Sequence, residues 1–246
     1  MAANYNCLLF DLDGTLLDFA VAEREAVEKT LQKFSLPSGP ETVELFSSIN
    51  ASLWAALERG EIKKDKLAVQ RFTQLLQQLG AEGDAIKMNN EYLTNLSAVA
   101  IPMPGAEEML AELAEFATLA VVSNGVQRVQ LSRLKKSGLL PYFDEVFVSE
   151  KLGVTKPSPR FFDLSLKALG IANRGKVLVI GDSLTADIQG GINAKLATCW
   201  CNYANAENTT AIKPTYTVRD FSQIKLYAVG EEELKRAENR EKRHLV

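Results

Sequence analysis

Short apolar runs that alternate with helix-like segments are the feature that most limits how this chain can fold. The strand-like runs cover residues 7–10, 118–122, 146–148, 176–180 and 197–200, with a short last one at 215–218. Continuous apolar runs of this length are typical of strands that are buried on both faces. Because most of these runs are separated by segments with helical spacing, we expect right-handed crossovers between parallel strands. The pattern predicts an α/β fold with a doubly wound, Rossmann-like parallel sheet.

The segment between the first two strands has helical spacing only. Residues 18–100 contain four apolar stripes and no strand-like run; Ile49 and Leu53, for example, lie one turn apart on the second stripe. Four helices with short connections favour a small antiparallel bundle. We therefore expect residues 18–100 to form an α-helical cap domain, inserted into an α/β core made of residues 1–17 and 101–246.

Two acidic residues follow the first strand. Asp11 and Asp13 are separated by one residue and precede Gly14. Alternate residues of an extended chain point the same way, so both carboxylates can converge at the carboxyl edge of the sheet, where open α/β sheets bind ligands. Two acids there repel each other unless a cation or a shared proton intervenes. The alternative is an Asp-Gly turn without a chemical role.

Other strands end in groups that complement these acids. Ser123 and Asn124 follow the second strand, Lys156 lies in the loop after the third, and Asp182 follows the fourth. Asp11 and Asp182 suit one Mg²⁺ ion, a hard cation that prefers a few carboxylates together with water and phosphate. Ser123, the backbone amides beside it and Lys156 suit a phosphoryl group.

Each of these groups also has a plainer explanation when it is taken alone. Ser123 and the Asn-Gly that follows it are typical of a turn, and Asp182 of a helix cap. Asp187 is either a solvated helix residue or a group that orients Lys156 or a metal-bound water. The combination, with complementary groups in four successive loops, favours the chemical interpretation.

Composition excludes several other classes of protein. The 246 residues carry a net charge of -3, with 46% hydrophobic and 24% charged residues, so we expect no nucleic-acid or membrane partner. The only histidine, His244, lies in a charged tail over residues 231–246, which argues against histidine-based catalysis and metal binding. The cysteines, Cys7, Cys199 and Cys201, form no metal-binding or disulfide pattern, and no signal peptide is expected. We expect a cytoplasmic protein with reduced thiols.

The four motifs together resemble those of the haloacid dehalogenase-like (HAD) hydrolase superfamily. They are Asp11-Leu12-Asp13-Gly14-Thr15, Ser123-Asn124, Lys156-Pro157 and Gly181-Asp182-Ser183 with Asp187, in that order along nearly the whole chain. The inserted helical segment resembles the all-helical cap class of that superfamily. The resemblance implies a HAD-type α/β fold and a Mg²⁺-dependent hydrolase, with Mn²⁺ as a substitute metal.

The resemblance also implies a role for each motif residue. Asp11 would be the nucleophile that forms an aspartyl-phosphate, and Asp13 the general acid and base. Asp11, the backbone carbonyl of Asp13 and Asp182 would bind Mg²⁺. Ser123, Asn124 and Lys156 would hold the phosphate, and Asp187 would support them. The true dehalogenases resemble this chain but lack a carboxylate at the position of Asp13, so its presence favours phosphate esters.

Further segments resemble the pyrimidine 5′-nucleotidases, which act on ordinary and modified nucleoside monophosphates. These segments are residues 50–54, 101–105, and 190–194 with 196–200. Within the cap, Asn50 and Trp54 lie one helical turn apart, so Trp54 can stack on a base while Asn50 reads its edge. Packing in the cap core is the alternative for Trp54. Phe19, next to the first motif, is a further candidate for lining the substrate site.

The expected activity is the hydrolysis of pyrimidine (deoxy)nucleoside monophosphates, including modified ones. One alternative is a phosphatase with the same residues that acts on phosphoglycolate or sugar phosphates. An alternative of another class is a non-catalytic, phosphate-binding regulatory protein, which the intact motifs disfavour. The expected partner is a small phosphate ester, and the chain is expected to be a monomer or a homodimer.

Overall fold

The computed structural model describes residues 3–236, which form two compact units. The α/β unit comprises the described residues up to Leu17, Pro102–Val126 and those from Gly138 onward. The helical unit comprises Asp18–Ile101 and Gln127–Ser137. The predicted charged tail covers residues 231–246, of which the structure describes only 231–236, and these are helical. His244 lies outside the described residues.

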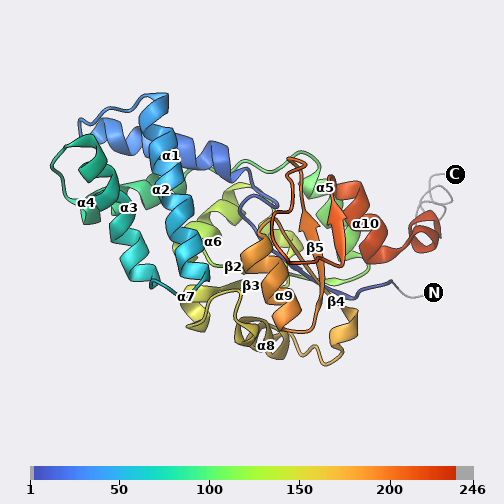
Figure 1. Cartoon of the computed structure of the whole chain (residues 1–246). Coiled ribbons are helices and arrows are strands. Elements are labelled where there is room, and N and C mark those ends of the chain that lie inside the picture. Colours follow the sequence, from blue (N-terminus) through green and yellow to red (C-terminus); the bar gives the residue numbers. More distant parts are fainter. Residues whose placement is uncertain (1–2, 237–246) are drawn as a thin grey trace, which may run out of the picture. The chain divides into compact units, whose positions relative to one another are not determined.

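A parallel sheet forms the centre of the α/β unit. Within the described residues it has six strands in the order β3-β2-β1-β4-β5-β6, and every neighbouring pair is parallel (Figure 1). The strands are β1 (Cys7–Phe10), β2 (Thr118–Ser123), β3 (Glu145–Val148), β4 (Val177–Gly181), β5 (Ala197–Cys201) and β6 (Tyr216–Val218). The order confirms the predicted doubly wound topology, because the chain moves outward from β1 to β3 and then crosses back to β4.

Helices cover both faces of this sheet. The helices of the α/β unit are α5 (Ala106–Ala114), α7 (Ser149–Leu152), α8 (Pro159–Ala168), α9 (Gln189–Asn193) and α10 (Phe221–Val229). Helices α8 and α9 lie on one face, and α5 and α10 lie side by side on the other (Figure 1). An ion pair of 2.7 Å between Lys225 and Glu112 links α10 to α5. Two covered faces explain why the central strands β1 and β4 are apolar and buried throughout.

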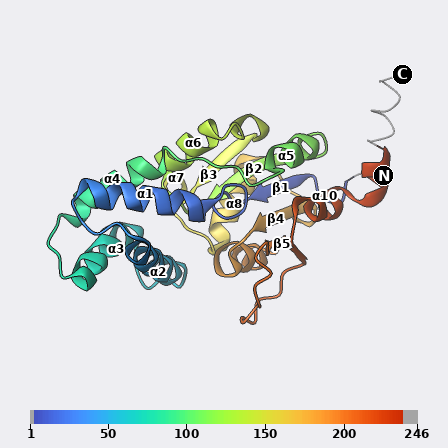
Figure 2. The same ribbon diagram turned by 90° about the horizontal axis from the view of Figure 1, so that it is seen from above.

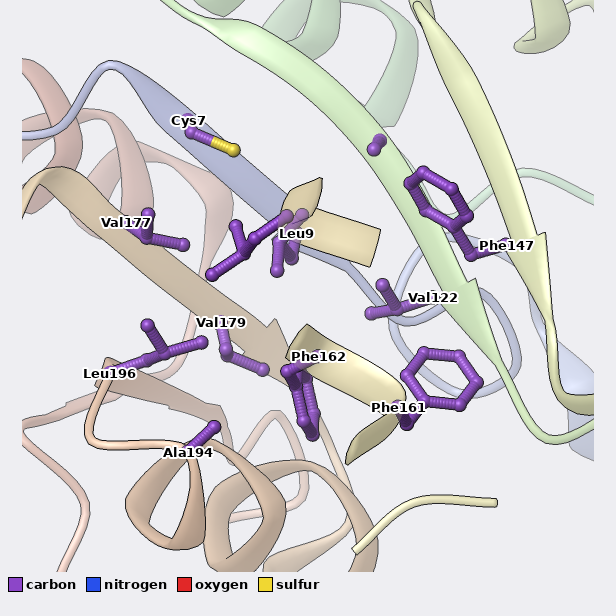
Figure 3. Packing of buried hydrophobic residues seen from close by; sticks show 12 residues of the cluster. Cys7, Leu9, Val122, Phe147, Phe161, Phe162, Val177, Val179, Ala194 and Leu196 are labelled. Carbon is purple, nitrogen blue, oxygen red and sulfur yellow. The ribbon is translucent and has the colours of Figure 1, made fainter. Parts of the chain in front are cut away.

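The strand register builds the core between the sheet and α8. Leu9 pairs with Ala120 on one side and Val179 on the other, so these three side chains point to the same face. Phe161 and Phe162 of α8 fill the surface that they create (Figure 3). All five residues are fully buried. This packing fixes the strands, and with them the loops at their carboxyl ends.

The helical unit is a bundle with an aromatic centre. Its helices are α1 (Phe19–Lys33), α2 (Pro40–Glu58), α3 (Lys64–Leu79), α4 (Ala85–Leu96) and α6 (Gln127–Lys136). Helices α1 and α4 lie side by side, and α2 and α3 form a second pair (Figures 1 and 2). The rings of Phe46, Phe72 and Tyr92 meet with centroids 4.9–5.9 Å apart. Asp18 and Asp84 cap α1 and α4 by accepting backbone N–H groups.

Helix α6 groups with the helical unit rather than with the α/β unit. The prediction assigns residues 101–246 to the core, whereas residues 127–137 pack with α4. The guanidinium of Arg133 donates to the carbonyl of Val99, and Ser132 and Lys136 both donate to the carbonyl of Ser97. Carbonyls at the end of a helix lack partners within it, which gives these donors their targets. The sequence period shows that α6 is a helix but not which unit receives its side chains.

None of the helices in the described part of the chain combines the length and the apolar character that crossing a membrane requires.

Candidate active site

The predicted polar residues of the α/β unit meet at the carboxyl edge of its sheet. Strand β1 pairs with β2 and with β4, so Asp11 lies between the ends of these two strands. Ser123 is the last residue of β2, and Asp182 follows β4 directly. The backbone N–H of Asp11 donates to the carbonyl of Ile180 at 2.8 Å, which continues the ladder one residue beyond the strand.

Lys156 is the centre of the charge network. Its ammonium donates to Asp11 Oδ1 at 2.6 Å, to Asp187 Oδ1 at 2.6 Å and to the carbonyl of Val122 at 2.7 Å. These three acceptors match the three protons of an ammonium group. The side chain of Lys156 is only 2% exposed. A buried charge of this kind is tolerated because it is paired and fully hydrogen-bonded.

Asp187 is held in place by the turn that follows β4. Its Oδ2 accepts the backbone N–H of Ser183 at 3.1 Å while Oδ1 accepts from Lys156. The preceding Gly181 is required here, because a Cβ on it would lie 2.3 Å from the Asp187 carboxyl group. Asp187 therefore contacts Lys156 directly, and its predicted role in orienting that residue stays a prediction.

Asn124 binds the loop of Lys156 with its side chain. The Asn124 Oδ1 accepts the backbone N–H of Lys156 at 2.9 Å, and its Nδ2 donates to the Lys156 carbonyl at 3.0 Å. Both ends of the Asn124 amide therefore contact the backbone of Lys156, and the phosphate-binding role of Asn124 stays a prediction. Ser123, which is buried, accepts the backbone N–H of Gly125 through its hydroxyl at 3.0 Å.

Three carboxylates lie close enough to share a cation. One oxygen each from Asp11, Asp182 and Asp187 lies within 4.8 Å of the others. Gly14, with a φ of 81°, allows the first loop to approach, because a Cβ there would lie 2.4 Å from a carboxylate oxygen of Asp182. Carboxylate clusters of this kind suit a hard divalent cation. Asp13 is half-buried and is not part of this cluster of carboxylate oxygens.

Burial and mutual repulsion shift the protonation of these groups. Burial raises the pKa of Asp11 well above its usual value; the charge of Lys156 opposes this shift, and the other acids add to it. Burial lowers the pKa of Lys156, but Asp11 and Asp187 outweigh it and raise that pKa overall. Asp182 is exposed as a residue, but the protein atoms around its carboxyl group displace water from it. This desolvation, together with the charge of Asp187, raises the pKa of Asp182 to about 7. The site therefore carries an excess of acid that a cation would relieve.

The three predicted substrate-contacting residues all lie in the helical unit. Phe19 is half-buried, with its ring 5.9 Å from the guanidinium carbon of Arg133. Trp54 is half-buried on α2, one turn from Asn50. Their contacts with a substrate stay predictions.

Asn50 is engaged inside the helical unit. Its Nδ2 donates to Glu23 Oε1 at 2.6 Å, and its Oδ1 accepts from Arg71 at 3.3 Å. Arg71 also donates to Asn89 Oδ1 at 2.9 and 2.5 Å, and all four residues are buried. These bonds link α1, α2 and α3, and the base-reading role of Asn50 stays a prediction.

Sequence reasoning missed the polar contacts that support Asp182. Thr15 Oγ1 donates to Asp182 Oδ1 at 3.4 Å, and the indole N–H of Trp200 donates to the Asp182 carbonyl at 2.9 Å. The hydroxyl of Tyr203 donates to the carbonyl of Thr15 at 3.3 Å. Trp200 lies in an apolar strand, where its spacing indicates only burial, so no local signal could have identified it.

The sheet and its charged edge define an α/β enzyme fold, and similarity identifies the family. Residues 5–195 match the family model of haloacid dehalogenase-like hydrolases. The chain is 38% identical over 221 residues to the pyrimidine 5′-nucleotidase PynA of Streptococcus pneumoniae, covering 89% of this chain and 93% of that protein. It is 32% identical over 220 residues to the pyrimidine 5′-nucleotidase YjjG of Escherichia coli, covering 89% and 96% respectively.

A solved structure agrees with this assignment. The crystal structure of YfnB from Bacillus subtilis bound to magnesium matches with a TM-score of 0.86 and 36% identity, covering 90% of this chain and 97% of that one. The chain therefore belongs to the haloacid dehalogenase-like hydrolase family and is a hydrolase, as the motifs predicted.

Proposed function

We propose that this protein is a Mg²⁺-dependent phosphomonoesterase that dephosphorylates pyrimidine (deoxy)nucleoside monophosphates, including modified ones. The single observation that carries the chemistry is the buried pair of Lys156 and Asp11, 2.6 Å apart, beside the carboxylates of Asp182 and Asp187. The substrate class rests on the similarity to PynA and YjjG, which are named pyrimidine 5′-nucleotidases. The helical unit acts in this proposal as the cap that selects the substrate.

Asp11 is the proposed nucleophile. Lys156 holds Oδ1, so Oδ2 is the oxygen that attacks phosphorus. The new O–P bond forms an aspartyl-phosphate as the bond from phosphorus to the ester oxygen breaks, which divides one difficult displacement into two steps. Lys156 also offsets negative charge in the transition state, where electrostatic stabilisation supplies much of the catalysis. Ser123 and the backbone amides after it bind the phosphoryl oxygens.

Asp13 is the proposed proton shuttle. It lies two residues after Asp11 at the same edge and is half-buried, so water can exchange its proton. In the first step its carboxylic acid protonates the leaving alkoxide. In the second step its carboxylate removes a proton from the water that attacks the aspartyl-phosphate. Phosphate leaves, and both aspartates return to their initial states. A halide leaving group needs no such proton, so Asp13 favours phosphate esters.

The donor set fits Mg²⁺. Asp11 and Asp182, together with the backbone carbonyl of Asp13, supply hard oxygen ligands, and Asp187 lies behind them with both oxygens in use. When bound, a divalent cation supplies charge neutralisation for the phosphoryl group and the acidic cluster. Because the pKa of Asp182 is raised to about 7, this carboxyl group must lose its proton before it can act as a ligand.

A phosphate-release assay tests the substrate class. The purified protein with Mg²⁺ is expected to release phosphate from UMP, dUMP and dTMP with a higher kcat/KM than from phosphoglycolate or sugar phosphates. A clear preference for phosphoglycolate or a sugar phosphate would contradict the nucleotidase proposal but keep the phosphatase. Release of no phosphate from any ester, with binding of inorganic phosphate retained, would indicate the regulatory alternative.

Removal of divalent cations is expected to abolish this activity. EDTA should reduce phosphate release to the background rate. Without a cation, the negative charges of Asp11, Asp182 and the substrate phosphate would repel one another. Adding excess Mg²⁺ should restore the activity within the same sample, which controls for unfolding by the chelator. Activity that persists after dialysis against EDTA would contradict the metal role of Asp182.

A further inference from the structure

Trp200 makes a polar contact with the loop that carries Asp182, in addition to its packing in the core. It lies in β5 opposite Gly181 of β4, one residue before Asp182. Its indole N–H donates to the backbone carbonyl of Asp182 at 2.9 Å, and the residue is only 8% exposed. A buried indole N–H needs an acceptor, and here that acceptor belongs to the loop that carries the acidic cluster.

Tyr203 makes the matching contact with the other acidic loop. Its hydroxyl donates to the carbonyl of Thr15 at 3.3 Å, and Thr15 in turn donates to Asp182 Oδ1 at 3.4 Å. The ring of Tyr203 packs edge-on against Phe221, with centroids 5.6 Å apart, which limits its movement. Two side chains from the end of β5 therefore hold the backbones of both loops.

The two contacts converge on one group. The backbone carbonyl of Asp182 accepts a hydrogen bond from Trp200, and its carboxylate accepts one from Thr15. The backbone carbonyl of Thr15 in turn accepts a hydrogen bond from Tyr203. Gly14 lies so close to Asp182 that a Cβ on Gly14 would lie 2.4 Å from Asp182 Oδ2. The two loops are therefore in tight contact at this point. A small shift of either loop would change where the Asp182 carboxylate lies relative to Asp11.

We propose that Trp200 and Tyr203 are positioning residues that set the affinity of the acidic cluster for Mg²⁺. The inference rests on the proposed function, because it assumes that Asp11 and Asp182 share a divalent cation. Neither residue supplies a ligand atom or contacts the reacting phosphoryl group. Residues that orient metal ligands through hydrogen bonds typically change metal affinity by about 10–100-fold when they are replaced.

The test compares metal affinity with turnover. Trp200→Phe retains an aromatic ring but loses the N–H, and Tyr203→Phe loses only the hydroxyl. By isothermal titration calorimetry with MgCl₂, we expect each variant to bind Mg²⁺ about 10-fold more weakly than the unchanged protein. At saturating Mg²⁺ we expect kcat for the preferred ester to stay within about 3-fold, because Asp11, Asp13 and Lys156 are unchanged.

Trp54→Phe is the matched control for the loss of an indole. Trp54 is the other tryptophan of the chain and lies in the helical unit, so its replacement should leave the Kd for Mg²⁺ unchanged. Circular dichroism and thermal unfolding establish that each variant is folded, and Tyr203→Phe alone decides the matter if Trp200→Phe does not fold.

The outcomes separate the two proposals. Unchanged Mg²⁺ affinity in the folded variants would overturn the positioning role while leaving the proposed function intact. A loss of kcat of about 10-fold at saturating Mg²⁺, with the Kd for Mg²⁺ unchanged, would also overturn the positioning role, because the contacts would then act on turnover and not on metal affinity. If the protein without any substitution binds no Mg²⁺, both proposals are overturned.

Discussion

Replacing Asp11 with Asn is expected to reduce phosphate release from the preferred nucleoside monophosphate by at least about 1,000-fold. The amide has no anionic oxygen to attack phosphorus, so the aspartyl-phosphate cannot form. Steady-state kinetics with UMP at saturating Mg²⁺ measure the loss. The size of the effect follows from the role of the group, because removing a nucleophile removes the reaction path rather than one contact.

The fold is expected to survive this change. Asn has nearly the same shape as Asp, and its Oδ1 can still accept a hydrogen bond from Lys156, which lies 2.6 Å from that atom in the unchanged protein. Burial raises the pKa of Asp11, so a neutral amide at this position avoids the cost of burying a charge. Asp163→Asn is a matched control on the exposed side of α8, where the aspartate pairs with Arg174. Turnover of Asp11→Asn close to that of this control would overturn the assignment of the nucleophile.

Replacing Lys156 with Met is expected to abolish activity and to destabilise the protein by about 3–5 kcal/mol. Methionine fills a similar volume but leaves the carboxylates of Asp11 and Asp187 buried without their cation, and each loses the hydrogen bond that Lys156 donates at 2.6 Å. The free energy of unfolding in urea measures the loss of stability. Activity disappears as well, because the positive charge that holds Asp11 is gone.

Two further variants test this explanation. Lys225→Met removes an ion pair with Glu112 at the protein surface, so it should cost only about 0–1 kcal/mol. Combining Lys156→Met with Asp187→Asn should recover part of the lost stability, because one uncompensated charge is removed. A cost for Lys156→Met no larger than that for Lys225→Met would contradict the importance of the buried network.

The positions of the strands along the chain could be predicted because each strand has a local signal in the sequence. Residues 7–10 and 176–180 are apolar throughout, and a strand covered by helices on both faces has that composition wherever it lies in a sheet. The polar residue after each run marks the carboxyl edge, so the convergence of Asp11, Ser123 and Asp182 on that edge could be predicted as well.

The contacts of single side chains could not be predicted in the same way. The sequence places Asn124 after a strand, but only the position of the Lys156 loop shows that its amide hydrogen-bonds the backbone of Lys156. The spacing of Asn50 does not show that its amide hydrogen-bonds Glu23 and Arg71, because these residues lie on other helices. The helical period of α6 is the same whichever unit it packs against.

The sequence by itself determined the fold class and the inventory of chemical groups, because period, burial pattern and motif order are local properties of the chain. The tertiary structure alone decided how those groups are held. It brought Asp187 to Lys156, and Trp200 to the carbonyl of Asp182, across separations of 31 and 18 residues. Hydrogen bonds act over about 3 Å, so partners distant along the chain are defined only once packing has fixed the strands and loops that carry them.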